Sequence, residues 1–98
     1  MTDSDIEELI LRAVRHMNLA RKPDAQIMVS PAAPLFGADS PLDSLGLVSL
    51  LMDVEEGLAD RGFDITLSDA RAMSQRLSPF RSVPALVSYI RETLAADR

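Results

Sequence analysis

The chain has 98 residues, of which 47% are hydrophobic and 26% charged, and a formal net charge of −5. This length allows one domain over residues 1–98, and the composition is that of a globular protein rather than of a disordered chain. Because it has no cysteine and one histidine, His16, the chain cannot supply a thiol nucleophile, a disulfide scaffold or a multi-histidine metal centre. We therefore expect no metal site.

The charge and hydropathy also restrict the partners. A sequence pI of about 4.6 argues against nucleic acid as a partner. No window approaches the roughly 18 consecutive apolar residues of a membrane-spanning helix, and the first residues are acidic where a secretory signal would be basic. We expect a cytoplasmic monomer that binds neither nucleic acid nor membranes.

The negative charge is concentrated in the middle of the chain. The segment 39–69 holds eight acidic residues and a single arginine, whereas the rest of the chain holds nine basic and seven acidic residues. An acidic segment within a nearly neutral chain suggests a surface for a basic partner.

The first predicted helix covers residues 5–20. Its apolar residues recur at intervals of three and four, which is the spacing of one helical face: Ile6, Leu9, Ile10, Ala13, Val14 and Met17. Ser4 and Glu7 predict a capping box at its start. His16 lies off the apolar stripe, so we expect it on the surface.

A long connection follows, and its four prolines exclude a continuous helix. Apolar residues within it, among them Ile27 and Leu35, predict an ordered loop that lies across a helical core.

The second predicted helix covers residues 44–61, with Gly62 as its C-terminal cap. Leu47, Leu50, Leu51, Val54 and Leu58 form one apolar face. We expect Leu45, Val48 and Met52 to widen this face and to make the helix the most buried one. The remaining line of residues is predicted to be exposed and mostly acidic: Gly46, Ser49, Asp53, Glu56 and Asp60.

Two more helices are predicted, a short one over residues 69–75 and a longer one over residues 83–95, the latter capped by Ser82. The expected fold is therefore all-α, a four-helix bundle with three longer helices, one short helix and a long first loop.

The triplet Asp43-Ser44-Leu45 opens the second helix after this long loop. In a chain of this length and helix order, the triplet resembles the attachment motif of the acyl carrier protein family. The resemblance implies an acyl-carrier-like bundle in which Ser44 bears a covalent 4′-phosphopantetheine arm derived from coenzyme A. It further implies a phosphoprotein of fatty acid, lipid or secondary-metabolite synthesis that is not an enzyme but holds an acyl group as a thioester. No catalytic residue is therefore expected.

The same resemblance implies the partners. These are a phosphopantetheinyl transferase and the ligases, synthases or transferases that use the cargo, docking through basic patches. The residues implied in docking are Asp43, Leu45, Val48, Asp53, Glu55, Glu56 and Asp60. If the cargo folds into the bundle, candidate lining residues are Val48, Met52, Leu67, Met73, Phe80, Leu86 and Ile90.

Some features depart from the family. Gly46 and Ser49 are neutral where fatty-acid carriers usually have acids, which favours a specialised carrier over a general one. Ser40 is a rival attachment residue, but Pro41 follows it where the family has Leu or Ile. Two alternatives remain open: an aminoacyl or peptidyl carrier, and an unmodified helical interaction module in which Ser44 only caps its helix.

Overall fold

The computed structural model describes residues 2–35, 44–65, 67 and 81–96. Within these ranges the chain forms the helices α1 (Asp3–Asn18), α2 (Ser44–Asp60) and α4 (Val83–Ala96), and a 3-10 turn η1 (Pro23–Ala25). No strand occurs in the described ranges, so the predicted all-α class is confirmed. The short helix predicted over residues 69–75 lies outside the described residues, and the four-helix bundle stays a prediction.

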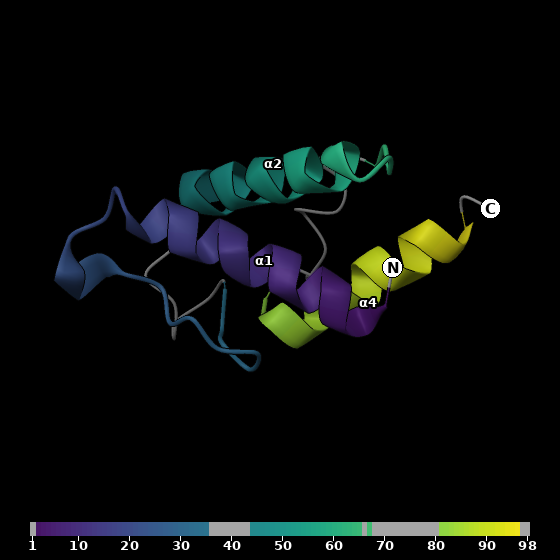
Figure 1. Cartoon of the computed structure of the whole chain (residues 1–98). Helices are drawn as coiled ribbons and strands as arrows, with labels where there is room; N and C mark the ends of the chain where they lie inside the picture. The colour runs from purple at the N-terminus through teal and green to yellow at the C-terminus, as the bar shows by residue number, and fades with distance from the viewer. Residues whose placement is uncertain (1, 36–43, 66, 68–80, 97–98) are drawn as a thin grey trace.

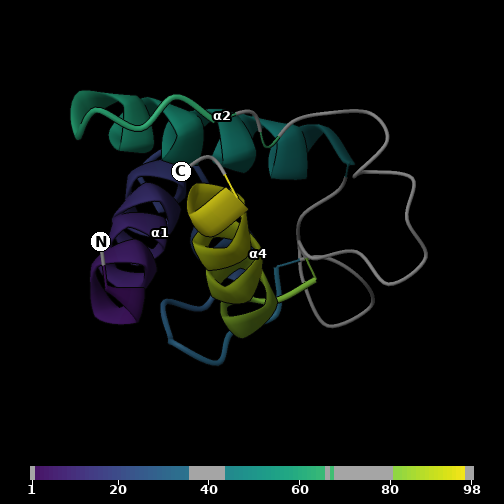
Figure 2. The ribbon, with the colours of Figure 1, turned by 90° about the vertical axis from the view of Figure 1, so that its right-hand side faces the viewer.

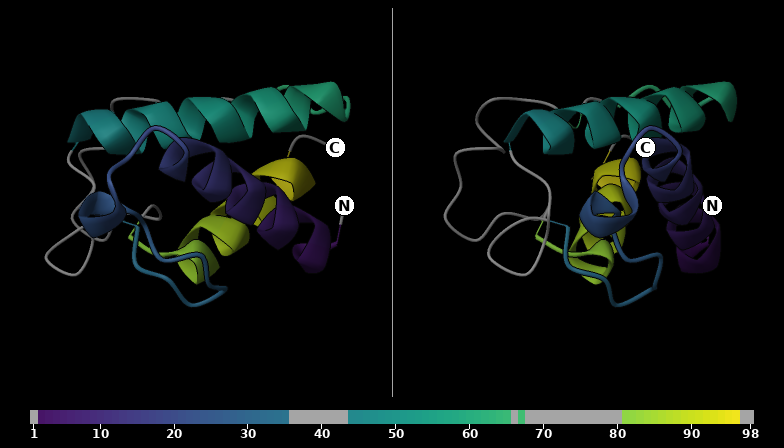
Figure 3. Two further views of the ribbon diagram at one scale, coloured as in Figure 1. Left: turned by 60° about the vertical axis from the view of Figure 1, so that its left-hand side comes forward. Right: turned by 90° about the vertical axis from the view of Figure 1, so that its left-hand side faces the viewer.

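Helix α1 packs against both α2 and α4, and α2 lies across one side of this pair (Figures 1 and 2). It runs antiparallel to α2, because Leu9 lies against Gly57 while His16, two turns later, faces the earlier Asp53. The start of α1 is joined to α4 by an ion pair between Arg91 Nη1 and Asp3 Oδ2 at 2.7 Å. Because α1 and α2 are antiparallel, the start of α2 lies at the same end of the molecule as the end of α1 (Figure 3).

A single apolar cluster fills the space between the three helices. The predicted faces of α1 and α2 are buried as expected, except that Met17 is only partly covered. Leu11 is also buried, although the stripe did not include it. No charged or polar side chain is buried among the described residues, so the cluster is held by apolar contact alone.

The predicted start of α1 is wrong by two residues. The capping box is formed by Thr2 and Asp5, not by Ser4 and Glu7. The Asp5 N–H donates to Thr2 Oγ1 at 3.2 Å, and the Thr2 N–H donates to Asp5 Oδ2 at 3.0 Å. Asp serves here in the place of the usual Glu, which is why the sequence pattern pointed to the later serine.

The predicted caps at the C-terminus of α2 and at the N-terminus of α4 agree with the structure. Gly62 has a φ of +88°, a left-handed conformation that glycine adopts without strain. The N–H of Gly62 donates to the Ala59 carbonyl and that of Phe63 to the Leu58 carbonyl, each at 2.9 Å, which is a Schellman motif. Ser82 Oγ accepts the N–H of Ala85 at 3.3 Å, so both predicted caps are confirmed.

The described part of the long connection is ordered by two sets of hydrogen bonds. Asn18 exchanges two bonds with the backbone of Ile27, at 2.8 and 2.9 Å. Further along, Pro34 forms an antiparallel bridge with Ser82, just before α4. Ile27 and Leu35 are both buried, as predicted.

The expected widening of the apolar face of α2 is wrong. Leu45 is 77% exposed and Met52 is 57% exposed, while Val48 is half-buried. At 100° per residue, Leu45 and Met52 lie on the side of the helix opposite Val54. Six residues of α1 and five of α2 are buried, so α2 is not the most buried helix.

Candidate functional site

The candidate attachment residue, Ser44, is the first residue of α2. This position places it at the positive end of the helix dipole, where phosphate groups are stabilised. The first turn of α2 contains no acidic residue that would oppose a phosphodiester. Asp43 and the rival Ser40 lie outside the described residues.

An apolar surface begins directly beside Ser44. Leu45 and Met52 are seven residues apart and so lie on one side of α2, with Val48 between them near its edge. Two of the five large hydrophobic side chains exposed among the described residues are in this pair. Both side chains are therefore available for apolar contact on this side of α2.

The acidic residues of α2 begin farther from Ser44. The first is Asp53, nine residues along, which corresponds to about 14 Å at 1.5 Å per residue. The surface next to Ser44 is therefore apolar and neutral within α2, and the acidic part lies on the second half of the helix.

Asp53 interacts with another helix of the same chain. Its Oδ2 lies 3.5 Å from Nδ1 of His16 on α1, and their side chains are 34% and 74% exposed respectively. His16 is on the surface as predicted, but no sequence pattern indicated that it would face Asp53. The antiparallel packing of α1 and α2 brings the two side chains together. The apolar spacing within each helix does not predict which residues of the two helices meet.

Glu55 is also engaged within the chain. Its carboxylate accepts the backbone N–H of Leu67, twelve residues later, and Leu67 is fully buried. This bond fixes the chain after the turn at Gly62 against α2. The family resemblance implied Glu55 in docking, and helical periodicity carries no signal of a bond between a side chain and a distant backbone group.

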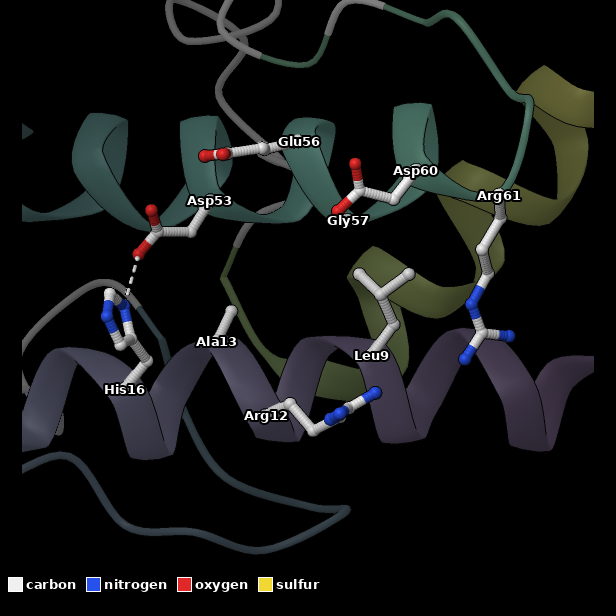
Figure 4. A pocket seen from close by; sticks show the side chains of 9 residues that line it. All are labelled: Leu9, Arg12, Ala13, His16, Asp53, Glu56, Gly57, Asp60 and Arg61. Carbon is white, nitrogen blue, oxygen red and sulfur yellow. Dashed lines mark hydrogen bonds and ion pairs between the residues drawn. The ribbon is translucent and has the colours of Figure 1, made fainter.

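Glu56 and Asp60 line an open groove of about 450 Å³ between α1 and α2 (Figure 4). Its floor is made by Leu9, Ala13 and Gly57, and its basic residues are Arg12, His16 and Arg61. Within the described part of the chain, neither Glu56 nor Asp60 lies within ion-pair distance of a basic group. These two carboxylates are the most accessible members of the predicted acidic line.

The candidate cargo-lining residues do not gather in one place. Leu67, Leu86 and Ile90 are fully buried in the apolar cluster, whereas Met52 is exposed on the outer side of α2 and cannot line an interior. Met73 and Phe80 lie outside the described residues.

Neither a family model nor a curated protein nor a solved structure matches this chain. None of the described helices has the length and apolar character needed to cross a membrane. Within the same residues, no three His, Asp or Glu side chains are grouped so that they could hold a metal ion.

Proposed function

We propose that this protein is an acyl carrier whose Ser44 bears a 4′-phosphopantetheine arm. The observation that carries the proposal is the motif Asp43-Ser44-Leu45 at the first residue of α2, next to an exposed leucine. A serine hydroxyl at a helix start can be reached by a modifying enzyme. The arm supplies a terminal thiol, which this cysteine-free chain lacks, for holding a cargo as a thioester.

The residues around Ser44 suit this role. The dipole of α2 stabilises a phosphodiester at its N-terminus, and the acid-free first turn does not repel it. The exposed side chains of Leu45 and Met52 offer apolar contact to a partner, and Glu56 and Asp60 offer charge for basic residues farther along. Asp53 and Glu55 contribute less to docking in this proposal, because each carboxylate is bound within the chain.

The surface around Ser44 supports a specialised carrier rather than a general fatty-acid carrier. A partner that recognises acids just after the attachment serine would find Gly46 and Ser49 there. The partner enzymes in this proposal are a phosphopantetheinyl transferase and a small dedicated set of acyl-transferring enzymes.

The test is to incubate the purified protein with coenzyme A, Mg²⁺ and a phosphopantetheinyl transferase of broad specificity, and then to measure its intact mass. We expect a gain of one phosphopantetheine on the natural chain and on Ser40→Ala, and no gain on Ser44→Ala. If neither serine is modified, the chain is an unmodified helical module and the proposal is wrong.

A further inference from the structure

Three apolar residues of α2 lie close to Ser44 along the helix. Val48 and Met52 follow position 44 at intervals of four, so these positions lie on successive turns of one side of α2. The rise from position 44 to Met52 is about 12 Å at 1.5 Å per residue. Leu45 and Met52 are exposed and Val48 is half-buried. We call Leu45, Val48 and Met52 the α2 apolar side.

The surroundings of the α2 apolar side are uncharged within the helix. Residues 44–52 contain no Asp, Glu, Lys or Arg, and the first charged residue of α2 is Asp53, whose carboxylate faces His16 on α1. An apolar group that lies on this side therefore covers apolar surface without taking a charge of α2 out of water.

Three of the candidates for lining an internal cargo site lie in packed surroundings. Leu67, Leu86 and Ile90 are each 0% exposed, so their side chains border almost no space that a water molecule could enter. A chain placed among them would have to displace packed atoms, and protein interiors resist added volume. By contrast, the α2 apolar side can be covered without displacing the buried cluster.

We propose that the α2 apolar side holds an apolar acyl chain carried on Ser44, so that the cargo lies along the outside of α2 and not within the bundle. The inference rests on the proposed function, since the arm on Ser44 tethers the chain to the start of this helix. The arm is flexible, so its acyl end can fold back onto Met52. A tethered group loses less freedom on binding than a free ligand does, and a contact with few side chains is therefore enough to hold it.

This position of the cargo links docking to release. Leu45 and Met52 also offer apolar contact to a partner enzyme in the proposed function. A partner that docks on these two side chains would displace the acyl chain from them and leave it free to enter the partner's active site. Docking and cargo release are then a competition for one surface.

The experiment compares methyl NMR spectra of the isotope-labelled protein loaded by a phosphopantetheinyl transferase from acetyl-coenzyme A or from octanoyl-coenzyme A. We expect the octanoyl form to differ from the acetyl form at the methyl signals of Leu45, Val48 and Met52, with nuclear Overhauser effects between the octanoyl chain and Met52. Differences at Leu86 and Ile90 instead would place the chain inside the bundle and overturn the proposal. Identical spectra would place the chain in solvent, with the same consequence.

Met52→Ser and Met28→Ser form a matched pair, because both methionines are exposed and only Met52 belongs to the α2 apolar side. We expect Met52→Ser to lower the ratio of bound to free octanoyl chain about tenfold, measured from the shift of the Leu45 methyl signals. Met28→Ser should leave this ratio unchanged. Equal effects of the two variants, or none of Met52→Ser, would contradict the proposal.

Intact mass, measured before the NMR spectra, separates this inference from the proposed function. A chain that gains no acyl-phosphopantetheine contradicts both of them. A loaded chain whose octanoyl group does not contact the α2 apolar side contradicts the inference alone and leaves Ser44 as the attachment residue.

Discussion

At the scale of single residues, the capping box at the start of α1 makes a pH-dependent contribution to stability. The pKa of Asp5 is lowered by the hydrogen bond from the Thr2 backbone N–H and then by that from the Thr2 side chain. In the unfolded chain the pKa of an Asp is about 4. The stabilisation is therefore fully present above that value and is lost as the pH falls through the lower pKa of the folded state.

We expect Thr2→Ala to lower the free energy of unfolding by about 1 kcal/mol at neutral pH, because α1 loses its N-cap. NMR titration of the Asp5 carboxyl group should then show its pKa rising only in part, because Thr2→Ala keeps the backbone N–H that is the first cause of the lowered pKa. A pKa of Asp5 that is identical in Thr2→Ala and the natural chain would show that the Thr2 side chain does not contribute to the shift.

Glu55 and Glu56 are neighbours in sequence with different structural roles. Glu55→Ala removes the acceptor for the buried N–H of Leu67, which should cost about 1–3 kcal/mol in the free energy of unfolding. Glu56→Ala changes an exposed carboxylate and should cost less than about 0.5 kcal/mol. Urea unfolding measures the difference in stability between the variants.

Hydrogen exchange at the Leu67 amide provides the local test of this bond. We expect Leu67 to exchange faster in Glu55→Ala and at the natural rate in Glu56→Ala. Glu55→Gln keeps an acceptor oxygen and should show intermediate protection. Unchanged exchange at Leu67 in Glu55→Ala would show that the bond is not formed in solution.

At the scale of helices, two glycines limit substitution for different reasons. Gly62 has open space around it but a φ of +88°, so Gly62→Ala should cost about 1 kcal/mol through backbone strain alone. At Gly57 the backbone is ordinary, but a Cβ would lie 3.2 Å from Leu9 Cγ. A branched side chain there, as in Gly57→Val, should cost about 1–3 kcal/mol by separating α1 from α2.

Chemical denaturation of the two glycine variants measures these costs. Combining Gly57→Val with Leu9→Ala makes room for the new side chain, so the two effects should not add. Gly62→Ala should lower the free energy of unfolding by the same amount with and without Leu9→Ala. Additive losses at Gly57 and Leu9 would contradict the close approach of the two helices.

The sequence predicted the helices better than it predicted how they pair. Apolar spacing located three helices and most of the core, because burial of one stripe per helix determines that pattern. The same reasoning placed Leu45 and Met52 in the core, because it considered their hydrophobicity but not their angular position around α2, opposite Val54. The start of α1 was missed because Asp5 replaces the Glu of the usual capping box.

The candidate site was predictable only in part. The position of Ser44 at the start of a helix followed from local sequence, and the structure places it there. The engagement of Asp53 with His16 and of Glu55 with Leu67 depends on contacts between segments far apart in the chain. Helical periodicity does not predict such contacts. Of the four acids implied in docking within α2, Asp53 and Glu55 are bound within the chain, and Glu56 and Asp60 are accessible.

At the scale of the whole molecule, the net charge of −5 includes a groove between α1 and α2 in which acidic and basic side chains meet. The accessible acids Glu56 and Asp60, on the second half of α2, line this groove together with Arg12, His16 and Arg61. Since α1 and α2 are antiparallel, the end of α1 and the start of α2 lie at the same end of the molecule (Figure 1). A carrier built in this way would offer the exposed side chain of Leu45 next to its attachment serine and acidic side chains only farther along α2.

The central claim is that Ser44 carries the prosthetic arm, and fragmentation of the transferase-treated chain in a mass spectrometer tests it most directly. Backbone cleavage between Ser40 and Pro41 separates the two candidate serines. The account predicts that the added phosphopantetheine stays with the fragment that begins at Pro41 and maps to Ser44. Its appearance on the fragment ending at Ser40, or a chain that accepts no phosphopantetheine, would contradict the account.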